Sequence, residues 1–318
     1  FMMDWHGRRY YAFDSFVKNT FGEKLYKVSL DGGFTCPNRD GTLGTGGCIF
    51  CSAGGSGDFA ADACLSIRDQ ITQGIFLVAA KSSSSRYIAY FQAFTNTYGP
   101  IEKLRRIFTE AIEDPRIAAL SIGTRPDCLP EDVLSLLHEL NAIKPVFVEL
   151  GLQTIHSETA ELIRRGYPLS CFETAVSRLA SIGVYTVVHL ILGLPGETKD
   201  MMLDSIRYLN HFPIHGVKFS MLHILKGTDL ADLYSKNPFQ VFTMDTYVDL
   251  ILECIGNLRK DIVIHRLTGD GPKELLIAPL WSLQKRTVLN KIAHQLKVQN
   301  LRQGDLIEKH ISYSSQIV

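Results

Sequence analysis

Three cysteines lie close together near the start of the chain, within the segment TCPNRDGTLGTGGCIFC at residues 35–51. Cys48 and Cys51 form a C-x-x-C pair, and eleven residues separate Cys36 from Cys48. Cysteine thiolates are strong metal ligands, and a C-x-x-C pair can grip one metal centre from a single turn. Glycines are frequent in the same segment and let the backbone approach a ligand closely. The set indicates a metal site with three protein thiols.

Two kinds of metal centre are compatible with three thiols. A structural zinc site needs a fourth protein ligand, for which Cys64 is the best candidate. A 4Fe–4S cluster held by three cysteines leaves one iron free for a small molecule, so three thiols are then a complete set. The chemistry favours the cluster. Three buried free cysteines remain as a third interpretation, which a polar, glycine-rich loop disfavours.

Short β-like runs alternate with helical patterns along most of the chain. Strands are expected at residues 25–30, 86–91, 117–122, 145–153, 184–192 and 216–222. Helices are expected at residues 63–79, 101–112, 130–143 and 157–166, then in a segment ending near 181 and from about 197 onward. In the second helix, Ile101, Leu104, Ile107 and Phe108 recur at helical spacing. The alternation predicts an α/β fold with a parallel sheet, closed as a barrel or left as an open, barrel-like arc.

The pattern changes after residue 226, where a helix at 244–260, a strand at 262–267 and a helix at 281–298 are expected. We therefore expect three parts, namely an N-terminal extension (1–24), a β/α core (25–226) and a C-terminal extension (227–318). The cysteine segment directly follows the first strand. In β/α folds, the loops at the carboxyl ends of the strands carry the active site.

Composition narrows the class of protein. The chain has 318 residues, 46% hydrophobic and 21% charged, with a formal net charge of zero. No run reaches the ~18 apolar residues of a membrane helix, and the N-terminus lacks the apolar core of a signal peptide. We therefore expect a cytoplasmic protein with no membrane partner. Its seven cysteines should then be reduced, which favours metal chemistry over disulfides.

Four segments together resemble motifs of the radical SAM superfamily. TRPDCL (124–129) is similar to the third-strand motif of the branch around the Elongator catalytic subunit. ELGLQTIHSETAELIRRGY (149–167) resembles the fourth-strand segment of oxygen-independent coproporphyrinogen oxidase, and HLILGLPGET (189–198) resembles the fifth-strand motif. GFTCPNRDG (33–41) resembles a bacterial family linked to tRNA wobble-uridine modification. The long cysteine gap departs from the usual C-x-x-x-C-x-x-C, but it is a feature of the Elongator-like branch.

The resemblance implies a partial (β/α)6 TIM-like radical SAM barrel with a C-terminal α/β extension. It implies that Cys36, Cys48 and Cys51 ligate a 4Fe–4S cluster and that S-adenosylmethionine (SAM) binds at the free iron. The SAM contacts that it implies are Phe50 at the adenine, backbone groups of Gln92 and Ala93 at the methionine amino group, and the side chains of Gln153, Arg165 and His189.

Some of these residues also have ordinary structural interpretations. Arg165 stands beside Arg164, which is an equal candidate for the same contact. Without the resemblance, Gln153 and Arg165 would be read as a polar helix start and a cation near a helix C-terminus. His189, in an apolar strand, would be read as a core histidine. Of the remaining cysteines, Cys128 follows a strand on the active-site side; we expect it and Cys64 to be structural.

The resemblance also implies a reaction. An external donor such as flavodoxin or ferredoxin reduces the cluster, and the electron passes to the sulfonium of SAM. Cleavage gives methionine and a 5′-deoxyadenosyl radical, which removes a hydrogen atom from the substrate. The cofactors supply this chemistry, and the protein orients them and excludes solvent. No further catalytic residue is implied.

Charge gives one indication of the substrate. Residues 275–304 contain five basic side chains and no acidic ones, namely Lys285, Arg286, Lys291, Lys297 and Arg302. This patch contacts tRNA phosphates or is a solvated helix face. The polar loop HRLTGDGP (265–272) faces the open end of the barrel or is an ordinary turn. Three hypotheses follow: a radical SAM enzyme that modifies a wobble uridine in tRNA, a radical SAM oxidase or decarboxylase of a small molecule such as a porphyrinogen, and a non-enzymatic zinc-binding module.

Overall fold

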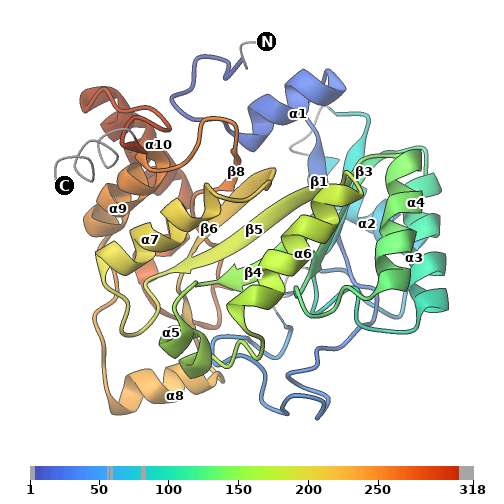
Figure 1. Cartoon of the computed structure of the whole chain (residues 1–318), viewed down its shortest axis with the longest axis horizontal. Helices are drawn as coiled ribbons and strands as arrows, with labels where there is room; N and C mark the ends of the chain where they lie inside the picture. Colours follow the sequence, from blue (N-terminus) through green and yellow to red (C-terminus); the bar gives the residue numbers. More distant parts are fainter. Residues whose placement is uncertain (1–3, 56, 58–59, 80–83, 308–318) are drawn as a thin grey trace, which may run out of the picture.

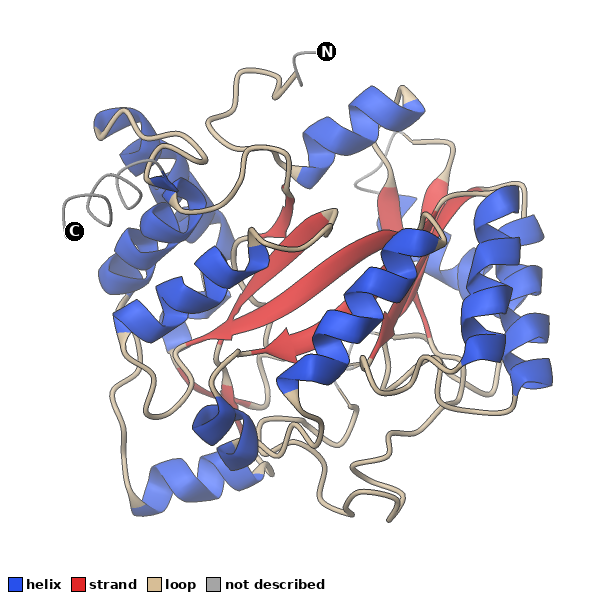
Figure 2. Cartoon of the chain, in the orientation of Figure 1, coloured by secondary structure: helices blue, strands red, loops and turns tan. Residues whose placement is uncertain are grey.

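A parallel β-sheet forms the centre of the protein in the computed structural model, which describes residues 4–55, 57, 60–79 and 84–307. Seven strands lie side by side in the order β1-β2-β3-β4-β5-β6-β8, and the sheet curls into a half-barrel (Figure 2). The strands are β1 (Tyr26–Leu30), β2 (Tyr87–Phe91), β3 (Ile117–Thr124), β4 (Val146–Gln153), β5 (Tyr185–Leu192), β6 (Gly216–Met221) and β8 (Val263–Arg266). The α/β barrel-like prediction is confirmed, with one addition. The strand expected in the C-terminal extension joins the same sheet as its seventh member.

Helices surround the half-barrel, most of them over its outer face and others across its two ends (Figure 1). They are α1 (Phe13–Phe21), α2 (Ile67–Ala79), α3 (Ile101–Glu113), α4 (Glu131–Ile143), α5 (Ser157–Leu162), α6 (Leu169–Ser181), α7 (Lys199–Leu209), α8 (Asp229–Lys236), α9 (Met244–Gly256) and α10 (Lys285–Val298). The face expected on α3 is the buried one, since Leu104, Ile107 and Phe108 all lie in the core. The helix expected over 281–298 is divided at Gln284 into a 3-10 turn, η1 (Leu280–Leu283), and α10.

A second, two-stranded sheet links the C-terminal part to the core. In it, β7 (Ile224–Leu225) pairs antiparallel with β9 (Leu276–Ala278). The Lys226 amide also donates to the Leu275 carbonyl at 2.8 Å. Neither strand was expected from the sequence, because each is too short to show a period. Their pairing holds the loop that follows β8 against the end of β6.

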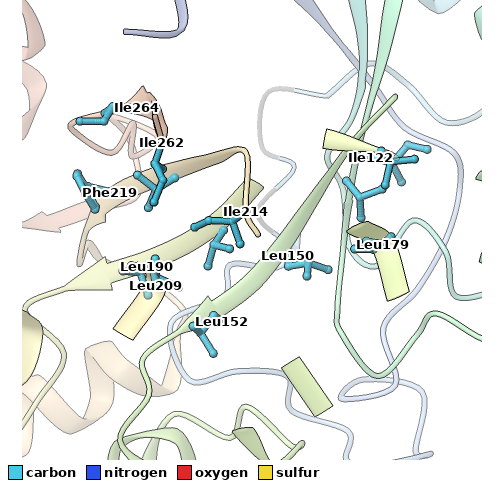
Figure 3. Packing of buried hydrophobic residues seen from close by; sticks show 14 of the residues in the cluster. Ile122, Leu150, Leu152, Leu179, Leu190, Leu209, Ile214, Phe219, Ile262 and Ile264 are labelled. Carbon is cyan, nitrogen blue, oxygen red and sulfur yellow. The ribbon is translucent and has the colours of Figure 1, made fainter. Parts of the chain in front are cut away.

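Side chains alternate between the two faces of each strand, and this alternation organises the interior. On β4, Val148, Leu150 and Leu152 belong to the large core between the sheet and the outer helices. Figure 3 shows Leu150 and Leu152 in this core, together with Leu179 of α6 and Leu190 of β5. The intervening residues of β4 point the other way, into the half-barrel. The inner face is therefore lined by every second residue of each strand.

Helix α1 closes one end of the half-barrel. Phe13 stacks on His265 with ring centroids 4.1 Å apart, and Phe16 meets His215 at 4.4 Å. Both phenylalanines also pack edge-on against Phe147 of β4. We call these five side chains the aromatic plug. Figure 1 shows α1 at the top, far from α5 and α8 at the bottom, so the plug lies at the amino ends of the strands. The opposite end holds the cysteine loop.

Candidate active site

The three cysteines of the sequence motif lie on the loop between β1 and α2, at the carboxyl end of the sheet. Cys36, Cys48 and Cys51 all line one cavity of about 280 Å³. Cys64, the alternative fourth ligand, is exposed and does not line this cavity. The fold therefore brings together the three thiols that the sequence singled out and leaves Cys64 outside.

Backbone hydrogen bonds fold the long gap of the motif (37–47) back on itself. The Leu43 amide donates to the Pro37 carbonyl at 2.8 Å, and the Gly47 amide donates to the Asn38 carbonyl at 2.7 Å. Gly47 has φ of 72°, a conformation that side chains disfavour. Because the gap closes into a compact loop, its length does not separate the first cysteine from the other two.

Two polar side chains of the same gap fasten the cysteines to the barrel. The Asn38 amide group donates to the Arg164 carbonyl at 2.7 Å and to the Cys48 Sγ at 3.5 Å. The Arg39 guanidinium donates to the Ser52 carbonyl at 2.6 Å. Hydrogen bonds to sulfur stabilise the thiolate form and tune an iron–sulfur centre. The "NR" of the sequence PNRDG thus holds the thiols in place.

The local electrostatics favour a thiolate at Cys48. The pKa of Cys48 is lowered to about 7, chiefly by a hydrogen bond with the Cys51 thiol. Burial opposes this shift, whereas a hydrogen bond from Asn38 and the charges of Arg125 and Arg39 lower the pKa further. Thiolates are the form that binds iron. Among the described residues, no three His, Cys, Asp or Glu side chains gather as a site for one metal ion. Each iron of a cluster takes its own thiolate, so three thiols on one cavity fit a cluster with one iron left open.

Most residues expected at SAM line the same cavity. The residues that do so are Phe50, Gln92, Gln153, Arg165 and His189. Ala93 is the exception, because it is buried beside Gln92 without lining the cavity. These residues come from the cysteine loop, the ends of β2 and β4, the middle of β5 and the segment after α5, so several elements contribute to one space.

Gln153 ends β4 in an unusual backbone conformation. Its φ is 68°, and the register with β5 shifts between Gly151 and Gln153. A side chain at Gly151 would collide with the Gln153 amide, since a Cβ there would lie 2.8 Å from Nε2. Positive φ at a non-glycine residue costs about 1–3 kcal/mol and clusters at functional sites. The glycine and the bulge together aim the glutamine at the cavity.

The structure distinguishes the two neighbouring arginines. Arg164 pairs with Asp229 at the surface, with half of its side chain exposed, and does not line the cavity. Arg165 is buried and lines it. Its guanidinium donates to the carbonyls of Thr154 at 2.6 Å and Tyr167 at 3.0 Å, and it lies 4.6 Å from the Tyr167 ring. Arg165 is therefore a fixed part of the cavity wall.

A fully buried carboxylate lies below these residues. Oε1 of Glu149 accepts hydrogen bonds from Lys27 Nζ and Ser121 Oγ, both at 2.6 Å. Oε2 accepts from the Tyr90 hydroxyl at 3.0 Å and from His189 Nε2 at 2.7 Å. The network joins five strands of the half-barrel across its interior. We call these five residues, together with Lys218, the charged layer.

Lys218 completes the layer by pairing with Oε2 of Glu149. Burial alone would raise the pKa of the Glu149 carboxyl, but the ammonium groups of Lys218 and Lys27 hold it well below its usual range. Burial, followed by the charge of Lys218, lowers the pKa of His189 to about 4. His189 is thus neutral near pH 7. Because the carboxylate only accepts, Nε2 carries the proton and Nδ1 remains an acceptor.

Several residues that line the cavity went unnoticed in the sequence. Tyr90, Glu149, Arg125 and Arg266 are among them. No hydrogen bond or ion pair joins the Arg266 guanidinium to another described residue. A signal existed for two of the four, since VFVELGL and IVIHRL each carry a charged residue in an apolar strand. An inward-facing charge on a buried strand marks a polar interior.

The polar loop at 265–272 does face the open end of the barrel. Arg266, Gly269, Asp270, Gly271 and Pro272 all line the same cavity as the three cysteines. Two of the five basic residues expected at tRNA are already paired, Lys285 with Asp270 and Lys291 with Asp245. The first of these pairs connects the basic segment directly to the cavity wall. None of the helices within the described part of the chain could span a lipid bilayer.

The chain is similar to known proteins along most of its length. Residues 40–209 match the family described as "Radical SAM superfamily", and residues 214–298 match "Radical_SAM C-terminal domain". "Uncharacterized protein YtqA" of Bacillus subtilis is 41% identical over 302 residues, which cover 95% of this chain and 94% of that protein. "tRNA uridine(34) acetyltransferase" of Methanocaldococcus jannaschii is 27% identical over 165 residues, 51% of this chain and 30% of that protein. The solved structure of Methanocaldococcus infernus Elp3 superimposes with a TM-score of 0.64 at 18% identity, covering 88% of this chain and 64% of that chain.

Proposed function

The chain belongs to the radical SAM superfamily, and on that premise we propose that it modifies the side chain of a wobble uridine in tRNA. Its cofactors are a 4Fe–4S cluster and SAM, as in its superfamily, so the zinc-module hypothesis is not retained. One observation carries the choice of tRNA, namely the similarity to an enzyme whose name specifies uridine 34 of tRNA. The chain spans 30% of that enzyme, so acetyl transfer is not carried over.

Cys36, Cys48 and Cys51 would hold the cluster. When bound, the cluster and SAM supply a 5′-deoxyadenosyl radical by reductive cleavage of a carbon–sulfur bond of SAM. The protein contributes the position of the thiols and their charge state. The Asn38 amide stabilises the Cys48 thiolate, and Arg39 keeps the two ends of the loop together.

The remaining cavity residues would orient SAM. Phe50 offers an aromatic face for the adenine. Gln153 projects into the cavity from its strained position, and the neutral His189 presents Nδ1 as an acceptor for a ribose hydroxyl. Arg165 has most of its donors engaged by carbonyl groups, so we propose that it acts at SAM as a nearby positive charge and as a support for Gln153.

The substrate would enter past the wall of the cavity that reaches solvent at Asp270. That wall is built from the end of β6 and the loop after β8, including His223 and Asp270. A nucleoside in a folded tRNA has to leave its stack before an enzyme can reach its base. The cavity lies at the end of the barrel, where such a nucleoside could be inserted. The charged layer forms the floor of the cavity and the aromatic plug closes the amino ends of the strands, so both exclude water from the site.

Nucleoside analysis of tRNA from cells that lack the gene tests this proposal. We expect one modified wobble uridine to disappear and a precursor to accumulate. Expression of the wild-type protein should restore the nucleoside, and so should the Cys64→Ala variant, which serves as a matched control. Cys48→Ala should not restore it. Unchanged tRNA nucleosides, combined with SAM cleavage by the purified protein, would instead support a small-molecule substrate.

A further inference from the structure

The loop between β8 and β9 forms one side of the mouth of the cavity. Asp270 lines the cavity, yet 38% of its side chain is exposed, so it stands at the boundary between the cavity and solvent. Its neighbours Gly269, Gly271 and Pro272 line the same wall. We call residues 267–272 the lip. Any group that enters the cavity from solvent on this side passes the lip.

The inner side of the lip is fitted to a partly buried histidine. A Cβ at Gly269 would lie 2.5 Å from the His223 ring, and one at Gly271 would lie 3.1 Å from it. His223 also lines the cavity, and its Nε2 is buried without a hydrogen-bond partner among the described residues. The glycines let the lip lie directly on this ring. A displacement of the lip would therefore uncover His223 and widen the mouth.

The outer side of the lip is held by one ion pair. Lys285 Nζ binds both carboxylate oxygens of Asp270, at 2.9 Å and 2.6 Å. Lys285 is the first residue of α10, and Arg286 follows it; both are exposed. Two cations at a helix N-terminus are unfavourable unless an anion lies nearby. The Asp270 carboxylate is that anion in this structure.

An ion pair of this kind is easily exchanged. Both partners are more than a third exposed, and pairs at the surface contribute little because water and salt screen them. A phosphate diester carries the same charge as the carboxylate. A nucleic acid backbone brings several such groups, so it can engage Lys285 and Arg286 together.

We propose that a phosphate of the tRNA backbone displaces Asp270 from Lys285 and thereby releases the lip from the mouth of the cavity. The inference rests on the proposed function, because it takes tRNA as the polyanion. It assigns Lys285 as a docking residue and Asp270 as the internal competitor of the phosphate. Access to the cavity is thus coupled to binding of the backbone, and the site stays covered until tRNA is present.

Binding of tRNA to the cluster-loaded protein tests the exchange. Lys285→Ala should weaken binding about three- to tenfold and reduce the salt dependence by about one phosphate contact. Asp270→Ala should tighten binding about two- to fivefold, because the competitor for Lys285 is gone. Asp270→Asn should act in the same direction. In the double variant, the gain from Asp270→Ala should vanish. Equal binding by the wild type and both Asp270 variants would overturn the proposal.

A second pair on α10 offers a matched control. Lys291 pairs with Asp245 at the surface and lies away from the cavity. Asp245→Ala removes the same kind of competitor but releases no lip. Asp245→Ala can therefore change the binding of tRNA, but it should leave the lip of the free protein as it is in the wild type.

Hydrogen exchange measures the lip itself. The amides of Leu275 and Leu276 both donate to the Pro272 carbonyl and report on the base of the lip. They should exchange faster in Asp270→Ala than in the wild type, whereas Asp245→Ala without tRNA should match the wild type. Added tRNA should accelerate them in the wild type and in Asp245→Ala alike, because both keep the Lys285–Asp270 pair. If these amides exchange at the same rate with and without bound tRNA, the coupling is refuted, while the tRNA function stands. Failure of the wild type to bind tRNA in about 0.05 M salt would overturn both.

Discussion

The two ends of the half-barrel interior are built from the same strands but have opposite character. At the amino ends, the side chains of the aromatic plug pack ring against ring, and none of them lines the cavity. At the carboxyl ends, the charged layer supports a cavity ringed by cysteines and polar side chains. Phe147 and Glu149 are two residues apart on β4 and face the same interior, yet one belongs to each end. Strand alternation sets which residues face inward, and side-chain chemistry then divides the interior into a closed end and a working end.

The largest expected effect lies at the working end. Replacing Cys48 with Ala removes one of the three thiols, so the cluster should not be retained and SAM cleavage should fall to background. Iron analysis and 5′-deoxyadenosine formation after anaerobic purification measure both. Cys64→Ala should retain iron and activity, because that thiol lies outside the cavity. Loss of iron in Cys64→Ala would mean that a fourth thiol takes part.

The next largest effect concerns the charged layer. Glu149→Ala leaves Lys218 buried without its counter-charge, and breaking a buried ion pair in this way costs about 3–5 kcal/mol. Urea denaturation of the variant should show this loss in the free energy of unfolding. Glu149 also fixes the tautomer of His189, so SAM affinity should fall as well. A stability like that of the wild type would show that the layer is not a tightly coupled network.

Partly buried histidines at both ends predict a dependence of stability on pH. Burial lowers the pKa of His215 to about 4, below the ~6.5 of an unfolded histidine. Between these values the unfolded chain binds a proton that the folded protein does not, so stability is lost as the pH falls from about 6.5 to 4. The loss approaches about 3 kcal/mol for His215 alone. His215→Leu should reduce the slope of unfolding free energy against pH in this window; an unchanged slope would contradict the assignment.

The smallest expected effect is a loss of stability that is confined to the closed end. Phe147→Leu removes part of the ring packing in the aromatic plug and should cost about 1–3 kcal/mol of stability. Phe147 does not line the cavity, so SAM affinity and iron content should stay at wild-type values. Thermal unfolding and SAM titration of the same preparation test the two halves of this statement. A large loss of SAM affinity would show that the plug also shapes the working end.

The sequence was most informative where one residue type had to recur at a fixed spacing. All six strands expected in the core are present, because buried parallel strands are short apolar runs between helices. The three cysteines are together on one cavity, as their spacing after the first strand indicated. Boundaries were less certain, as α10 shows: the expected helix is broken at Gln284, where no glycine or proline gave a signal. The division into parts at residues 24 and 226 stays a prediction.

By itself, the sequence determined the alternating α/β architecture and singled out the three thiols, because these follow from local periodicity and spacing. Only the tertiary structure decided which arginine faces the cavity, that Glu149 is surrounded by donors from five other strands, and that Lys285 reaches Asp270. Each of these depends on contacts between residues far apart in the chain. Such contacts are set by how the strands curl and how loops cross the end of the sheet, and no local pattern encodes them.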